Sequence, residues 1–254
     1  MAKDKVTIVK AGGKVLDTDQ ELSKLLFAFE AIEGKKILVH GGGVFINELC
    51  EKLDIKTQMV DGRRITSKAN MDVVLMACAG KLNKELVAGI NKLGMQAVGL
   101  CGSDLSIIKS TKRNPEPIDF GQVGDIESVD TKWLKIFVDN GVVPVISSIS
   151  QSDQYELLNT NADTIAANVA GALSEHFDVS LFFYFDKAGV LLDAEDDSSL
   201  IKELSKSEVD ELKAKNIIHK GMLPKLQNGF FALDKGVAEV KLGNSMGQGT
   251  KLYL

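Results

Sequence analysis

The chain has few cysteines, no long apolar run and no excess of basic residues, and each absence excludes a class of protein. Its three cysteines, Cys50, Cys78 and Cys101, form no CxxC pair, so we expect a reducing compartment without disulfides or structural zinc. The longest apolar runs, such as residues 179–185, are far shorter than the roughly 20 residues of a membrane span. A formal net charge of −5 argues against a grip on nucleic-acid phosphates. We therefore expect a soluble cytoplasmic protein without membrane or nucleic-acid partners.

The two commonest nucleotide-binding fingerprints, the Rossmann GxGxxG and the P-loop GxxxxGK[ST], are also missing. Three other glycine-rich turns follow strand-like segments, at residues 10–13, 40–43 and 99–102. In a parallel sheet such turns lie at the carboxyl ends of strands, where ligands bind, and glycine lets backbone amides approach anionic oxygens. A single turn is explained equally well as a tight connection between a strand and a helix. Three together favour an anionic ligand.

Strand-like and helix-like segments alternate along almost the whole chain. Short apolar runs rich in β-branched residues lie at residues 6–9, 36–39, 97–100, 142–146, 179–185 and 237–241. Amphipathic patterns predict helices at residues 20–32, 44–53, 69–93, 131–140, 162–173 and 207–215. This alternation is typical of an α/β fold whose mainly parallel sheet is covered on both faces. We place a lobe boundary near residue 178.

Several polar residues could carry chemistry. Arg63 and Arg64 precede a predicted helix, and a guanidinium group can hold a carboxylate bidentately. Residues 159–163, Asn-Thr-Asn-Ala-Asp, place two amides and a carboxylate at an expected helix start, and capping explains one of these three groups but hardly all. Lys10 leads the first glycine turn, and Lys225 lies near another helix start. Each lysine taken alone could equally be an ordinary surface residue.

Read in order, these pieces resemble the amino acid kinase family, and its N-acetylglutamate kinase branch in particular. The ordered series of motifs spans nearly the whole chain. Two of them, around Arg64 and Asp163, separate this branch from carbamate, uridylate and aspartate kinases. The matching set is Lys10-x-Gly12-Gly13, His40-Gly41-Gly42-Gly43, Gly62-x-Arg64-Ile65-Thr66, Gly80-x-x-Asn83-Lys84, residues 144–149, Asn159-x-Asn161-Ala162-Asp163, Asp186-x-x-Gly189, Gly221-Met222-x-x-Lys225 and Gly249-Thr250.

The resemblance implies a three-layer αβα sandwich with a mainly parallel central sheet. Residues 1–178 would form an N-terminal lobe for acylglutamate binding and dimerisation, and residues 179–254 a C-terminal lobe for ATP. The implied reaction transfers the γ-phosphoryl group of ATP to the side-chain carboxylate of N-acetyl-L-glutamate, a step of arginine biosynthesis. A homodimer insensitive to arginine is expected, because arginine-inhibited hexamers of the family carry an extra N-terminal helix and only about five residues precede the first strand here.

The resemblance also assigns catalytic roles, which agree with independent physical reasoning. Lys10 and Lys225 would flank the transferring phosphoryl group, and Asp163 would orient both ammonium groups. A carboxylate acceptor is already ionised at neutral pH, so the reaction needs no general base. Phosphoryl transfer then depends on in-line positioning and on cations that neutralise the phosphoryl oxygens. Asp163 is therefore expected to organise the lysines rather than to accept a proton.

The ligand-binding positions follow from the same motifs. Glycine amides would hold the reacting carboxylate, and an arginine and an asparagine the α-carboxylate; these positions are Gly42, Gly43, Arg64 and Asn159. The implied nucleotide-binding positions are Gly12, Gly13, Asp186, Gly189, Ile217, Ile218 and His219. Mg²⁺ is expected to arrive with ATP, and the protein itself is expected to form no metal site.

Departures from the family pattern leave alternatives open. Phe185 and Lys187 flank Asp186 where relatives usually have a hydroxyl residue and valine, which affects the nucleotide contacts. Arg63 adds a cation beside Arg64, so the acyl group could be succinyl instead of acetyl. Another branch, such as carbamate kinase or glutamate 5-kinase, and a nucleotide-binding regulator without catalysis are the remaining alternatives.

Overall fold

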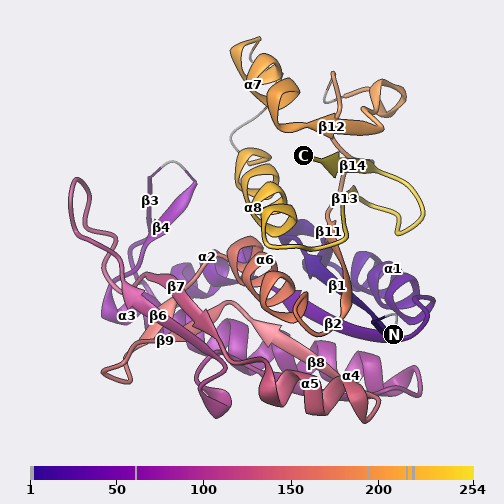
Figure 1. Ribbon diagram of the computed structural model, residues 1–254. Helices are drawn as coiled ribbons and strands as arrows, with labels where there is room; N and C mark the ends of the chain where they lie inside the picture. Colours follow the sequence, from indigo (N-terminus) through magenta and orange to yellow (C-terminus); the bar gives the residue numbers. More distant parts are fainter. Residues whose placement is uncertain (1–2, 61, 194, 216, 219–220) are drawn as a thin grey trace.

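A central sheet of eight strands organises the molecule, whose computed structural model describes residues 3–60, 62–193, 195–215, 217–218 and 221–254 (Figure 1). The strands are β1 (Lys5–Ala11), β2 (Lys35–His40), β5 (Gln96–Leu100), β8 (Val142–Ser147), β11 (Asp178–Tyr184), β12 (Glu203–Ser205), β13 (Glu239–Gly243) and β14 (Thr250–Tyr253). Their order is β12-β14-β13-β11-β1-β2-β8-β5, and every neighbouring pair except β13 and β14 is parallel. All six strands expected from the sequence belong to this sheet. The predicted α/β fold with a mainly parallel sheet is confirmed.

Helices cover both faces of this sheet, because side chains along each buried strand alternate between two apolar layers. On β1, Val6 and Ile8 pack with α5 (Thr131–Asp139), α6 (Ala162–Leu173) and α8 (Leu223–Asp234). Val9 and Ala11, which point to the other face, pack with α1 (Asp19–Glu30) and α4 (Asn83–Lys92). The result is the three-layer sandwich that the family resemblance implied.

The helix expected at residues 69–93 is one helical segment with a change of pitch in its middle. It begins at α3 (Lys68–Val74), where Ser67 and Asn70 form a capping box, continues as a π-helix over Leu75–Leu82 and ends as α4. The helices expected at residues 44–53 and 207–215 are α2 (Gly43–Lys52) and α7 (Lys206–Ala214). The structure adds α8, of which the sequence indicated only a start near Lys225. In the described part of the chain, no helix is long and apolar enough to cross a membrane.

Two smaller sheets, which the sequence reasoning missed, lie beside the carboxyl ends of the central strands (Figure 1). One is a hairpin of β3 (Gln58–Val60) and β4 (Arg63–Ile65). The other has the order β10-β9-β6-β7, and its strands are β6 (Ile108–Lys112), β7 (Gly124–Val129), β9 (Ile149–Gln151) and β10 (Leu157–Asn159). These strands are short and carry many polar side chains, so they lack the apolar runs that revealed the central sheet. They position Arg64 and Asn159.

The central sheet continues across the boundary expected near residue 178. Strand β11, which begins there, pairs with β1 along its whole length, from Lys5 opposite Asp178 to Ala11 opposite Tyr184. The two halves of the chain therefore share one sheet.

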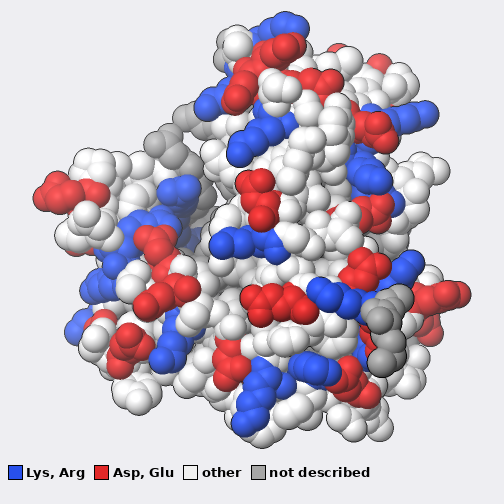
Figure 2. All heavy atoms as spheres, viewed as in Figure 1, with Lys and Arg blue, Asp and Glu red and all other residues white. Residues whose placement is uncertain are grey.

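On the face shown in Figure 2, acidic and basic side chains are interspersed.

Candidate active site

Three charged side chains meet where β1 ends and two helices begin. Lys10 lies near the end of β1, Asp163 in the first turn of α6 and Lys225 in the first turn of α8. On β1 the side chain of Lys10 follows Val6 and Ile8 on the face that packs against α6 and α8. The period-2 alternation of the strand therefore directs the lysine toward both helix N-termini.

Asp163 contacts both lysines at once. Its Oδ1 lies 2.8 Å from Nζ of Lys10, and its Oδ2 accepts a hydrogen bond of 3.3 Å from Nζ of Lys225. The side chains of Asp163 and Lys10 are only 6% and 8% exposed, so water screens this pair poorly. The ammonium group of Lys225 also lies 5.9 Å from the centre of the Phe185 ring. One carboxylate thus holds two cations in a fixed geometry.

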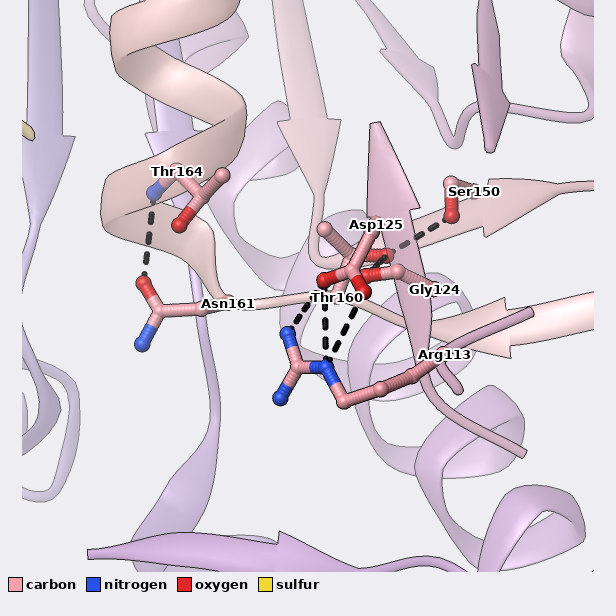
Figure 3. Close-up of polar contacts among 7 residues, drawn as sticks. All are labelled: Arg113, Gly124, Asp125, Ser150, Thr160, Asn161 and Thr164. Atoms are coloured by element: carbon pink, nitrogen blue, oxygen red, sulfur yellow. Dashed lines mark hydrogen bonds and ion pairs between the residues drawn. The ribbon is translucent and has the colours of Figure 1, made fainter. Parts of the chain in front are cut away.

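Local helix chemistry fixes the carboxylate in place. Asn161 caps α6, and its Oδ1 accepts a hydrogen bond from the backbone N–H group of Asp163 (2.8 Å). It accepts a second one from the backbone N–H group of Thr164 (3.2 Å), which Figure 3 shows. The partial positive charge of a helix N-terminus also favours an anion in the first turn. At this helix start Asn161 therefore caps the helix, and Asp163 supplies the negative charge.

The electrostatic environment keeps Asp163 ionised. Burial alone would raise the pKa of Asp163, but the attraction of Lys10 and Lys225 outweighs it and leaves the pKa below its ordinary value. Burial lowers the pKa of Lys10, and the Lys225 charge adds to this, while Asp163 opposes both. An acid held this firmly as its anion is a poor proton acceptor at neutral pH.

A pocket of about 320 Å³ opens on one side of Lys10 and Asp163. It is polar, and the glycine turn before α2, the β3–β4 hairpin and the segment leading into α6 form its walls. All four positions expected to bind the acceptor line it, together with two of the three expected catalytic residues: Gly42, Gly43, Arg64 and Asn159, with Lys10 and Asp163. Gly42 packs so closely on the π-helical segment that an added Cβ would lie 2.6 Å from Leu82.

Arg64 presents a buried positive charge to this pocket. Its guanidinium donates to Oδ1 of Asn47 (2.5 Å) and Oγ1 of Thr57 (3.3 Å). Burial lowers the pKa of Arg64 from its ordinary value, but an arginine remains protonated in proteins. Within the described residues, no acidic side chain pairs with this guanidinium. Its charge is therefore available to an anionic ligand. Arg63 is exposed at the pocket rim.

Arg113 also lines this pocket and was missed by the sequence reasoning, because it follows β6 in a segment without a motif. Its guanidinium pairs with Asp125 through several contacts, among them Nε to Oδ1 at 3.1 Å and Nε to Oδ2 at 3.2 Å (Figure 3). Beside it, Thr160 and Ser150 share a buried hydrogen bond of 2.7 Å. Unlike Arg64, Arg113 therefore has its charge compensated within the chain.

Asn159, another residue of this pocket, donates a hydrogen bond of 3.0 Å to Oγ1 of Thr66.

A second pocket, of about 510 Å³, opens on the other side of Lys225. It is more apolar than the first. Five of the seven positions expected for the nucleotide line it: Gly12, Asp186, Gly189, Ile217 and Ile218. Phe185 and Lys187 line it as well. Gly13 begins the 3₁₀ turn Gly13–Leu16, and His219 lies outside the described residues.

The two pockets meet at the charged cluster. Lys10 and Asp163 line the polar pocket, and Lys225 lines the apolar one. Two ammonium groups tied to one carboxylate can stabilise negative charge that moves from one pocket to the other. Among the described residues, no group of three or more His, Cys, Asp or Glu side chains could hold a metal ion.

Known proteins with similar sequences agree on one family. The amino acid kinase family profile matches residues 5–244. The acetylglutamate kinase of Phocaeicola vulgatus is 45% identical over 94% of this chain and 93% of its own length. That of Parabacteroides distasonis is 42% identical over 98% of this chain and 100% of its own.

Solved structures show the same fold. A Streptococcus mutans protein superposes with a TM-score of 0.82 at 25% identity, over 97% of this chain and 98% of its own. The carbamate kinase of Giardia lamblia, solved with AMP-PNP, reaches a TM-score of 0.70 at 12% identity, over 99% and 98% of the two chains. With the sequence matches, these likenesses show that the chain belongs to the amino acid kinase family, in the branch of its acetylglutamate kinase relatives.

Proposed function

We propose that the chain is an ATP-dependent acetylglutamate kinase that phosphorylates the side-chain carboxylate of N-acetyl-L-glutamate. The observation that carries this proposal is the pair of ammonium groups on Asp163, set between a polar and an apolar pocket. The names of the relatives, which match over nearly the whole chain, support the choice of substrate. The product would be N-acetylglutamyl 5-phosphate, for arginine biosynthesis.

The polar pocket suits an acceptor with two carboxylates. We assign the reacting carboxylate to the backbone amides of Gly42 and Gly43, because free N–H groups at the start of α2 favour anions. The α-carboxylate is assigned to Arg64, whose charge has no acidic partner among the described residues. Asn159 would donate to the same group. The pocket thereby orients the acceptor at two points, as in-line transfer requires.

The transfer itself needs positioned charge rather than a base. A side-chain carboxylate oxygen attacks the γ-phosphorus, the bond from phosphorus to the β–γ bridging oxygen breaks, and ADP leaves with that electron pair. Lys10 and Lys225 would neutralise the phosphoryl oxygens and the leaving group. Asp163 holds both lysines and stays ionised, in agreement with its lowered pKa.

The apolar pocket suits the nucleotide. We place the purine against Ile217 and Ile218 and the phosphates near Lys225, which lines the same pocket. Because the described residues form no metal cluster, we propose that Mg²⁺ arrives bound to ATP, since this ion is commonly held by substrate phosphates and water. Bound there, it would add positive charge to the phosphates. We propose that residues 1–178 mainly bind the acceptor and residues 179–254 mainly the nucleotide, with Gly12 of the first part also lining the apolar pocket.

We further propose that the chain forms a homodimer, as the family resemblance implies. Apolar side chains that are exposed in the isolated chain, such as Met76 on the π-helical segment and Ile136 on α5, are available to be buried. Light scattering should give about 55 kDa, twice the 27.5 kDa of the chain. A hexamer in solution would contradict this assembly.

A hydroxylamine-trapping assay tests the proposed reaction. With ATP and Mg²⁺, the protein should form the hydroxamate of N-acetylglutamate much faster than that of free glutamate or aspartate. Binding of ATP without turnover of any acceptor would instead favour a regulator without catalysis. Phosphorylation of carbamate in preference to acylglutamate would assign the chain to another branch.

A further inference from the structure

One motif, Gly80-x-x-Asn83-Lys84, has no part in either pocket, yet its asparagine reaches the glycine turn. Asn83 is 1% exposed, and His40, the last residue of β2, is completely buried. The side chain of His40 lies on the face of the sheet that packs against α4, and Asn83 is the first residue of that helix. The π-helical segment ends immediately before it. Such segments often occur at functional sites.

A chain of hydrogen bonds leads from Lys84 through Asn83 and His40 to the carbonyl group of Gly41, and each residue donates to the next. Nζ of Lys84 donates to Oδ1 of Asn83 at 3.2 Å, which fixes the orientation of the amide. The amide nitrogen then donates to the carbonyl of Val145 (2.8 Å) and to Nε2 of His40 (3.1 Å). Since Nε2 accepts, Nδ1 carries the proton, and it donates to the carbonyl oxygen of Gly41 at 2.9 Å. This tautomer is assigned from the partners.

From these contacts we infer that His40, held by Asn83, is a positioning residue that aims the amide of Gly42 at the acceptor carboxylate, an inference that rests on the proposed function. In a trans peptide the C=O and N–H groups point in opposite directions. Fixing the Gly41 carbonyl on the buried ring therefore turns the Gly42 N–H away from His40. Gly41 and Gly42 both line the polar pocket.

The surroundings of His40 keep its imidazole ring neutral and leave space for the Asn83 amide. Burial, with the nearby charges of Lys10 and Lys84, lowers the pKa of His40 to about 4, although its hydrogen bond to Gly41 acts in the opposite sense. A neutral ring keeps one donor and one acceptor nitrogen, as the chain of bonds needs. Gly99 on β5 makes room for the amide, because an added Cβ there would collide with Oδ1 of Asn83.

Nitrogen NMR of the protein labelled at its three histidines tests the tautomer without any need for turnover. We expect His40 to be protonated on Nδ1 only and not to titrate near its ordinary pKa. Protonation on Nε2, or titration near neutrality, would refute the inference. An inactive wild type would remove the proposed function, and the spectra would still decide whether His40 can hold the Gly41 carbonyl.

Two substitutions at His40 separate positioning from bulk. In His40→Asn the amide nitrogen can take the place of Nδ1, whereas in His40→Gln the longer side chain reaches the place of Nε2 and loses the bond to Gly41. We expect His40→Gln to lower kcat by roughly ten- to a hundredfold, with the KM for ATP unchanged, and His40→Asn to recover most of this loss. Equal kinetics in the two variants would contradict a role through Gly41.

A distant glycine provides a third arm in case both His40 variants fold poorly. Gly99→Ala should displace Asn83 and lower kcat in the same way, although Gly99 lies outside both pockets. Gly247→Ala is the matched control, because an added Cβ there meets nothing within 4 Å. Thermal melts accompany each variant. Wild-type kcat in a folded Gly99→Ala protein would count against the inference.

Discussion

Replacing Asp163 by asparagine removes one charge and almost no volume, and it tests how the charged cluster works. The carboxylate now compensates two ammonium groups at 2.8 and 3.3 Å, in a site where its side chain is 6% exposed. Without it, Lys10 remains buried beside a second cation. The pKa of Lys10, already lowered chiefly by burial, should fall further because the attraction of Asp163 is lost.

The expected loss of stability follows from this burial. Removing one partner of a buried ion pair costs about 3–5 kcal/mol, since a charge is left uncompensated. For a chain of this size that cost lowers Tm by roughly 10 °C. The sign also depends on pH. Because the pKa of Asp163 is lowered in the folded protein, its stabilising contribution is present above the unfolded-state pKa and is lost as the pH falls through the folded value, so variant and wild type should converge in acid.

Asp163→Asn should also lower the activity. With neither lysine tethered, kcat should fall by roughly a hundredfold or more. The defect should deepen as the pH rises, because a Lys10 ammonium group that has lost Asp163 gives up its proton more easily. Steady-state kinetics and thermal melts across pH measure both effects. Asp153→Asn is the control, because its pair with Lys109 is exposed and is worth less than about 1 kcal/mol. Near-normal turnover in folded Asp163→Asn would refute the organising role of Asp163.

Three further substitutions test the assigned roles. Lys225→Ala should reduce kcat by roughly a hundredfold while the KM values change less; unchanged turnover in steady-state assays would remove this lysine from the mechanism. Arg64→Lys should raise the KM for acetylglutamate far more than that for ATP, because an ammonium group cannot replace a bidentate fork; equal changes would point to a structural role. Arg63→Ala should leave the ratio of kcat/KM for acetyl- and succinylglutamate nearly unchanged, because Arg63 is exposed; a selective loss with succinylglutamate would place a second carboxylate against it.

Six of the eight strands of the central sheet could be predicted, because they read as short apolar runs, as the buried strands β1 and β11 do. Strands β12 and β14, which are short and carry polar side chains, were not predicted. The accessory strands could not be predicted either. Strand β6, with the sequence Ile-Lys-Ser-Thr-Lys, and β4, with Arg-Arg-Ile, show no such run. Pairing with β7 holds β6 in place, and β4 is held by its hairpin with β3. The π-helical segment was invisible as well, because it changes the helical period too briefly for the apolar pattern to show it.

The sequence could predict which residues belong to the candidate site, but it could not predict the contacts between them. The motifs named Lys10, Asp163 and Lys225, but only the convergence of β1, α6 and α8 places one carboxylate between both ammonium groups. Arg113 had no sequence signal, since its importance arises from a fold that brings β6 beside the pocket. The bond from Asn83 to His40 joins residues 43 positions apart, which no local pattern encodes.

The most direct test of the proposed reaction follows oxygen atoms. N-acetylglutamate labelled with ¹⁸O in its side-chain carboxylate is incubated with ATP, Mg²⁺ and the protein, and the phosphorus NMR spectrum of the acyl phosphate is recorded. Attack by the carboxylate on the γ-phosphorus predicts one ¹⁸O in the bridge between carbon and phosphorus, seen as an isotope-shifted product resonance. Release of only unlabelled inorganic phosphate, with no acyl phosphate formed, would contradict the proposal.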